Sequence, residues 1–201
     1  MAVAGKHGIT ENTTKNILFG AGTIHKGLKY TTGQSGGAGS WNFDASIIGA
    51  TSGGSKLSIV PEITPLEIDG PSVKVKGLSV KTGETATLEI NFIELTKELI
   101  KAATIGKDGT SADTNYDLIE SKDSVADGDY FENIAFVGKT LDGRNVIAIL
   151  DNALCTSGFE QEGKNKEGAI GKYTFECHAD PDSNFDTLPW HIYYPKASAS
   201  A

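Results

Sequence analysis

A strict alternation of side chains between Thr85 and Ile93 is the feature that most restricts the fold of this chain. Apolar side chains occupy every second position, and polar side chains fill the positions between them. Successive residues of a strand point to opposite faces, so a period of two indicates a strand with one face on a core. The predicted core face holds Ala86, Leu88, Ile90 and Phe92, and the polar face holds Thr85, Thr87, Glu89 and Asn91.

The hydrophobic period changes directly after this strand. Thr96 can cap a helix whose buried face carries Leu99, Ile100 and Ala103, and Gly106 can take the left-handed conformation that ends it. Before the strand, residues 73–76 also alternate, and the turn residues 81–84 predict that the two runs form a hairpin. Every other long run resembles a strand, so we expect a mainly β fold with one flanking α-helix at about residues 96–105.

Glycine content narrows the fold class further. The chain has 24 glycines in 201 residues, well above the average of about 7%. Glycine-rich loops between short strands are typical of a β-sandwich or barrel.

We expect an N-terminal arm (1–16), a single β domain (17–195) and a C-terminal tail (196–201). An apolar run of about 18 residues, which a membrane span needs, does not occur, and residues 1–10 lack the apolar centre of a signal peptide.

Further strands are predicted along the chain. Residues 17–27 form a strand in which Gly20 and Gly22 indicate a bulge, and residues 41–48 form a short strand. Residues 106–129 are a long polar surface loop that could carry a contact. Asp142-Gly143 predicts a type I′ hairpin turn, and Trp190 begins a last aromatic strand. The predicted core side chains are Leu88, Ile90, Phe92, Phe136, Ile147, Ile149, Tyr173 and Phe175.

Residues 49–70 predict a hairpin that projects from the β body. Pro61 and Pro65 interrupt it, and proline is tolerated only at sheet edges or outside the ladder. Its apolar side chains are too numerous to remain in water, and such a patch usually marks an interaction site. The alternative is a hairpin folded back on its own domain. The candidate interface residues are Ile59, Val60, Ile63, Leu66 and Ile68.

Motifs for catalysis or metal binding are weak. Residues 33–37 match G-x-S-x-G, but glycines and a strand follow the serine where the motif needs a helix. Residues 180–186 place oxygens at alternate positions as a calcium loop does, but Pro181 intrudes and the glycine at the sixth position is missing, so a turn is favoured. The histidines lack metal-ligand spacing. Cys155 and Cys177 could pair, but Cys177 shares its strand face with Tyr173 and Phe175, which indicates a small buried apolar residue. We expect neither an enzyme nor a cofactor.

Taken in order, several stretches resemble the tail tube (major tail) proteins of long-tailed bacteriophages that infect Gram-positive hosts. The resemblance covers about three quarters of the chain, and its order is a polar arm, a glycine-marked strand, a long loop, a strand-strand-helix unit and paired late strands. The stretches that carry it are residues 16–22, 48–54, 61–62, 66–70, 73–103 and 131–180.

The resemblance implies a structural virion protein that forms hexameric rings. These rings stack into the tail tube, through which DNA passes on ejection without specific binding, and inner strands join across subunits so that sheet edges are covered. It also implies that the long loop, here residues 49–70, locks neighbouring subunits and rings. The implied partners are further copies of the chain, a tape measure protein, and tail terminator and distal tail proteins. The implied location is the virion, with assembly in the host cytoplasm.

The negative net charge of the chain is consistent with such a tube. The net charge of −8 argues against nucleic acid as a bound ligand, and a ring of six copies carries six times −8, or −48, which would repel DNA phosphates in the bore. We expect Thr85, Thr87, Glu89 and Asn91 to face the lumen, unless that face meets bulk solvent outside. The alternatives are a monomeric carbohydrate-binding or adhesin-like sandwich and a head-tail joining or decoration protein.

Overall fold

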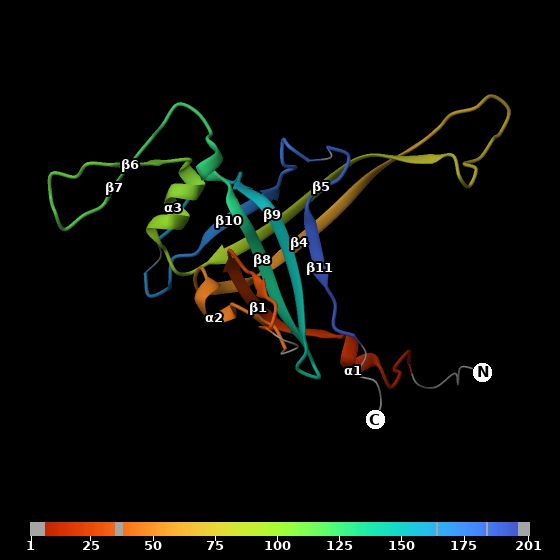
Figure 1. Cartoon of the computed structure of the whole chain (residues 1–201), viewed down its shortest axis with the longest axis horizontal. Coiled ribbons are helices and arrows are strands. Elements are labelled where there is room, and N and C mark those ends of the chain that lie inside the picture. Colours follow the sequence, from red (N-terminus) through yellow and green to blue (C-terminus); the bar gives the residue numbers. More distant parts are fainter. Residues whose placement is uncertain (1–6, 35–37, 164, 184, 197–201) are drawn as a thin grey trace.

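The computed structural model describes residues 7–34, 38–163, 165–183 and 185–196. Its main feature is one antiparallel sheet with the strand order β1-β8-β9-β10-β5-β4, in which β11 also pairs with β9 (Figure 1). The fold is therefore mainly β, as predicted, and the sheet does not close into a barrel. The strands of this sheet are β1 (Leu18–Lys26), β4 (Thr51–Pro65), β5 (Ser79–Phe92), β8 (Phe131–Thr140), β9 (Asn145–Cys155), β10 (Gly171–Cys177) and β11 (Trp190–Tyr193).

The predicted alternation is confirmed in β5. Ala86, Leu88, Ile90 and Phe92 are buried, whereas Thr85 is exposed and the other polar residues of this strand are half-buried. The partner of β5, however, differs from the prediction. β5 pairs with β4 over twelve positions, from Thr51–Phe92 to Pro65–Ser79, and residues 81–84 lie inside β5. Residues 73–76 belong to the connection between the two strands, because the longer ladder with β4 satisfies more backbone groups than a short local hairpin would.

Pro61 and Pro65 lie in β4, which is the last strand of the sheet. The expectation that these prolines occupy a sheet edge is confirmed. Proline has no N–H to donate, and on an edge strand that missing donor can face away from the ladder.

The predicted helix is α3 (Lys97–Thr104), and Thr96 caps it by accepting a hydrogen bond from the Leu99 N–H at 3.2 Å. Leu99, Ala102 and Ala103 are buried, while Ile100 is only half-buried. The left-handed residue that ends the helix is Ile105, with φ of 49°, and not Gly106 as predicted. Gly106 instead allows close packing against Ile119, since a Cβ at position 106 would lie 2.7 Å from the Ile119 side chain.

Two predicted segments fold differently. The strand expected at residues 41–48 is a two-residue strand, β3 (Ser40–Trp41), paired with β2 (Tyr30–Thr31) and followed by a helical turn, α2 (Phe43–Ser46). Asn42 causes the change, because its side-chain oxygen accepts from the Lys29 N–H at 2.7 Å and its side-chain nitrogen donates to the Gly27 carbonyl at 3.1 Å. A short helix, α1 (Thr13–Asn16), lies in the expected N-terminal arm.

The predicted bulge and late hairpin are both present. The register of β1 against β8 shifts between Phe19 and Thr23, where Gly20 and Gly22 have positive φ. The turn at Asp142-Gly143 joins β8 to β9, but only Gly143 has positive φ, so the turn is not type I′. The loop expected at residues 106–129 contains a small hairpin, β6 (Lys107–Gly109) with β7 (Leu118–Glu120), and the 3-10 turn η2 (Asp127–Asp129).

The sheet carries an apolar cluster on each face. The inner cluster holds Leu88, Ile90, Phe92, Tyr173 and Phe175, all fully buried as predicted, and α3 packs against it. Ile147 and Ile149 are also buried, but in a second cluster on the outer face with Leu28 and Val137. Phe136 is only half-buried at the margin of the inner cluster, because its ring lies beside Gly22 and Gly138, which provide no side chain to cover it.

Both cysteines are buried free thiols on the inner face. They are not paired, because Cys155 lies opposite Phe175 in the ladder and Cys177 lies opposite Ala153. Burial, together with the nearby Asp151, raises the pKa of the Cys177 thiol to about 12. Cys177 is therefore a protonated apolar residue at neutral pH, as its strand face predicted.

The first prediction tests the inner core. Phe92 is 2% exposed and packs edge-on against Tyr173 with ring centroids 5.5 Å apart. Phe92→Ala should lower the free energy of unfolding by about 3–5 kcal/mol, because it removes a fully enclosed ring and leaves a cavity. Phe19→Ala is the matched control, since that ring is 73% exposed, and it should cost less than about 0.5 kcal/mol. Equal losses in denaturant melts would contradict the assigned burial.

The second prediction concerns pH. His25 is 1% exposed, and its ring nitrogens lie 2.8 Å from Thr23 Oγ1 and 2.9 Å from Ser46 Oγ. Burial lowers the pKa of His25, so the unfolded chain takes up a proton first as the pH falls below about 6.5. The contribution of His25 to stability is thus complete above pH 6.5 and is lost between that value and the lowered pKa. In chemical denaturation, the stability difference between the wild type and His25→Gln should shrink over this window, and a constant difference would contradict the argument.

Candidate assembly surfaces

The arm of β4 and β5 projects from the body of the protein. The two strands leave the sheet together, and residues 66–78 connect them at the far end (Figure 1). We call residues 66–78 the tip. The projecting hairpin predicted for residues 49–70 therefore exists, but with different strands: residues 51–65 are one strand of it, and residues 79–92 are the other. The sequence prediction closed this hairpin at residue 70 and assigned residues 73–76 to a separate hairpin, so it did not recognise residues 79–92 as the return strand.

The five predicted interface residues divide into two groups. Ile59 is half-buried and packs against the inner cluster, so it belongs to the domain's own core as the alternative reading proposed. The other four are at least half exposed: Val60 53%, Ile63 63%, Leu66 53% and Ile68 57%. Sequence reasoning missed three exposed valines beside them, because it assigned two of them to a half-buried strand; they are Val73, Val75 and Val80.

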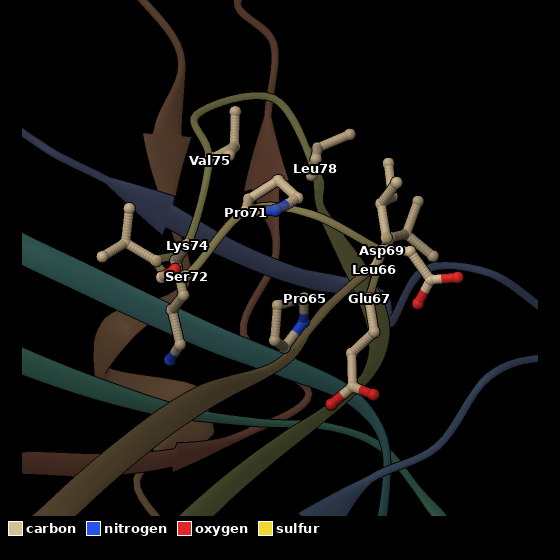
Figure 2. Close-up of a pocket in the computed structure, with 11 residues that line it drawn as sticks. Pro65, Leu66, Glu67, Asp69, Pro71, Ser72, Lys74, Val75 and Leu78 are labelled. Atoms are coloured by element: carbon tan, nitrogen blue, oxygen red, sulfur yellow. The ribbon is translucent and has the colours of Figure 1, made fainter.

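The tip lines an open hollow of about 640 Å³. Leu66 N–H donates to the Leu78 carbonyl at 2.6 Å and so closes the base of the loop. Figure 2 shows Val75 and Leu78 projecting on one side of this loop, with Glu67 and Lys74 pointing away from it. The hollow is therefore lined both by apolar side chains and by the charged residues Glu67, Asp69 and Lys74, a mixture that protein-protein interfaces also contain.

The sheet also has two edges. β1 and β4 are the terminal strands of the order, so each has one side without a sheet partner in the part of the chain that the structure describes. The segment just before β4 bonds to the edge of β1, where the Ile48 N–H donates to the Ile24 carbonyl at 3.2 Å. Away from this point, both edges present backbone groups to which another chain could add.

The predicted lumen-facing residues share one polar face, and Glu89 is the charged member of this set. Glu89 is bridged by Lys56 Nζ at 2.9 Å from β4 and by Lys172 Nζ at 3.0 Å from β10. These lysine hydrogen bonds lower the pKa of Glu89. Asn91 donates to the Gly54 carbonyl at 3.2 Å, and Thr85 and Thr87 continue the face toward the tip. These lysines lie far from Glu89 in the sequence, on the two strands that flank β5 in the sheet. The sequence alone therefore could not place them beside Glu89.

Arg144, the only arginine of the chain, joins both terminal segments to the β8–β9 turn. Its guanidinium donates to the Lys15 and Lys196 carbonyls, each at 2.9 Å, and to Asp142 Oδ2 at 2.7 Å. Tyr194 adds a hydrogen bond from its hydroxyl to Asn16 Oδ1 at 2.7 Å. A guanidinium is suited to this role because it carries five donors in one plane.

The outer face carries an aromatic groove near the end of β11. Trp41 contacts Tyr193 edge-on at 4.9 Å between ring centroids, and Phe43 lies 6.3 Å from Trp41. Tyr194, Asn145 and Ile147 also line this groove. Sequence reasoning assigned these aromatic residues only to strand faces, and α2 and the loop before it bring them together.

The candidate chemical motifs do not form a site. Residues 35–37 of the G-x-S-x-G match lie outside the described residues. In the segment 180–186, Asp180 Oδ1 accepts from the Asp182 N–H at 2.9 Å and the Asp180 carbonyl accepts from Ser183, which are the hydrogen bonds of a turn. Among the described residues, no group of three or more His, Cys, Asp and Glu side chains could hold a metal ion. Nor does any helix in that part of the chain have the length and apolarity to cross a membrane.

No protein-family model matches the chain, and a search of curated proteins finds no match to it. A function for the chain therefore has to be argued from the surfaces described above.

Proposed function

We propose that this chain is a structural protein of a bacteriophage tail that forms hexameric rings stacking into the tail tube. Its partners are further copies of itself along the tube, and a tape measure protein and terminal tail proteins where the tube begins and ends. DNA passes through the bore without specific binding. The sequence resemblance supports this proposal, and so do the surfaces available for assembly.

The observation that carries the proposal is the exposed apolar end of the β4–β5 arm. Ile63, Leu66 and Ile68 are more than half exposed at the end of a long arm, where no other described segment of the chain covers them. Burying such side chains releases about 25 cal/mol for each Å² of apolar surface. Several exposed apolar side chains gathered at one end of an arm favour a protein-protein contact.

The two sheet edges support the same function. In a ring, the free side of β4 in one subunit can lie beside the free side of β1 in the next, because a ring repeats one heterologous contact. Such pairing would satisfy backbone groups that a monomer leaves to water. Electron microscopy of the purified protein tests the proposal directly: rings or tubes are expected, and a chain that stays monomeric at high concentration would contradict it.

The third prediction tests the arm. Replacing the tip, residues 66–78, with Asn-Gly should leave a folded domain that no longer forms tubes, since β4 and its core residues are kept. A larger deletion of residues 52–67 would remove β4 itself, and with it Leu57 and Ile59 from the margin of the core. Circular dichroism checks the fold, and electron microscopy checks assembly.

The control for the tip variant is Leu141→Asn, which removes an apolar side chain of similar exposure, 48%, from the turn at the other end of the sheet. It should assemble normally. Tubes formed by the variant without a tip would show that the arm is dispensable.

The fourth prediction tests the lumen. Thr85→Lys with Thr87→Lys adds two positive charges per subunit and keeps the bridge between Lys56, Glu89 and Lys172 intact. If this face lines the bore, the added lysines bind passing phosphates and slow DNA ejection, more strongly at low salt. Thr85→Asp with Thr87→Asp is the matched control and should leave ejection unchanged. Wild-type ejection from lysine-variant particles with normal tubes would place this face outside the bore.

The aromatic groove favours a second candidate, a monomeric carbohydrate-binding module. Half-exposed rings of Trp41, Tyr193 and Tyr194 beside the Asn145 amide form a combination of apolar faces and hydrogen-bonding groups that suits a sugar. Glycan-array binding by a protein that remains monomeric would favour this candidate over the tube.

A further inference from the structure

The charge of the chain is concentrated at one end of the molecule. Residues 106–129, which we call the acidic lobe, hold seven acidic residues and two lysines, so they contribute −5 to the net charge of −8. Asp108 and Asp117 are paired with lysines of α3, and Asp129 is buried against Lys122. Asp113, Asp123 and Asp127 are exposed, and no salt bridge joins them to a lysine or arginine among the described residues.

The acidic lobe also exposes apolar side chains. Tyr116 is 71% exposed beside β7, Val125 is 50% exposed, and Leu118 is 38% exposed. An exposed aromatic ring among acidic residues can anchor a contact, because tyrosine buries a large area while its hydroxyl keeps a polar partner. The lobe therefore carries both a charge and an apolar anchor.

The return limb of the β4–β5 arm has the opposite charge. Residues 70–81 contain Lys74, Lys76 and Lys81 and no acidic residue. Lys81 pairs with Glu84 at 2.9 Å, whereas Lys74 and Lys76 have no ion pair within the described residues. They alternate with the exposed Val73 and Val75, so this limb presents apolar and basic side chains together, while Glu67 and Asp69 on the other limb make the tip as a whole neutral.

The tip and the acidic lobe lie at opposite ends of the long axis of the molecule (Figure 1). They cannot meet within one chain, but they can meet between two copies arranged head to tail. A contact between two different surfaces of the same chain repeats from copy to copy, as assembly into rings and tubes requires.

We propose that the tip of one copy docks on the acidic lobe of the next, with Tyr116 of the second copy in the tip hollow of the first. Lys74 and Lys76 then face Asp113 and Asp123, and Val73 and Val75 pack against Leu118 and Val125. The apolar contacts supply most of the affinity, and the charges determine orientation and speed association. This inference rests on the proposed function only in assuming that copies of the chain associate.

Charge exchange is the first test. The tip variant, Lys74→Glu with Lys76→Glu, and the lobe variant, Asp113→Lys with Asp123→Lys, should each self-associate at least about tenfold more weakly than the wild type at low salt, because like charges then meet. An equal mixture of the two variants should regain association, since the introduced glutamates of the tip variant then face the introduced lysines of the lobe variant. The unchanged lysines in the tip of the lobe variant likewise face the unchanged aspartates in the lobe of the tip variant. Lys74→Arg with Lys76→Arg keeps the charge and should associate like the wild type. Sedimentation velocity measures these four samples beside the wild type.

Cross-linking separates this contact from the tube itself. Chains carrying Lys74→Cys, mixed with chains carrying Asp113→Cys, should form disulfide-linked dimers under mild oxidation, while Cys155 and Cys177 stay buried. A Lys139→Cys chain, with an exposed site on the body, is the control and should not cross-link with Asp113→Cys. Cross-linked dimers without rings or tubes would contradict the proposed function but support the contact. Wild-type tubes with neither cross-linking nor rescue by mixing would overturn the contact alone.

Discussion

The pairing of β4 with β5 is the interaction on which the rest of the structure depends. Over its inner half, this ladder presents Leu57, Leu88 and Ile90 to the core, and over its outer half it continues beyond the body with no core to cover. The backbone hydrogen bonds extend through both halves, so the arm keeps its direction where packing ends. A single ladder therefore both closes the core and holds the apolar tip away from it.

The two faces of the sheet have different roles because different segments cover them. α3 covers part of the inner cluster, and the segment around α2 covers the outer cluster, so β8 and β9 are apolar on both sides. On β5 the outer side has no such cover, and it carries the polar face around Glu89. The helix and the loop that cover the sheet thus determine which part of it forms core and which part stays exposed to solvent.

The charged residues are distributed unevenly along the molecule. The acidic lobe lies at one end of the molecule, and the tip, where two lysines are balanced by Glu67 and Asp69, lies at the other, so the negative charge is unevenly distributed in a way that the net charge of −8 does not reveal. Near Glu89, in contrast, two lysines balance the carboxylate. A net charge alone therefore does not indicate whether a given face repels phosphate, and the position of each charge has to be known.

The sequence by itself determined what depends on local chemistry. The period of two placed the buried face of β5, Thr96 marked the start of α3, and Pro61 and Pro65 marked an edge strand, because each property follows from the residue and its immediate neighbours. The tertiary structure alone decided what depends on partners. It paired β5 with β4 in place of residues 73–76, put Ile105 in the left-handed conformation ahead of Gly106, left Phe136 at the margin of the core, and brought Lys56 and Lys172 to Glu89. Alternating residues fit many partners equally well, and only the competition among all possible ladders, settled by total hydrogen bonding and burial, selects one of them.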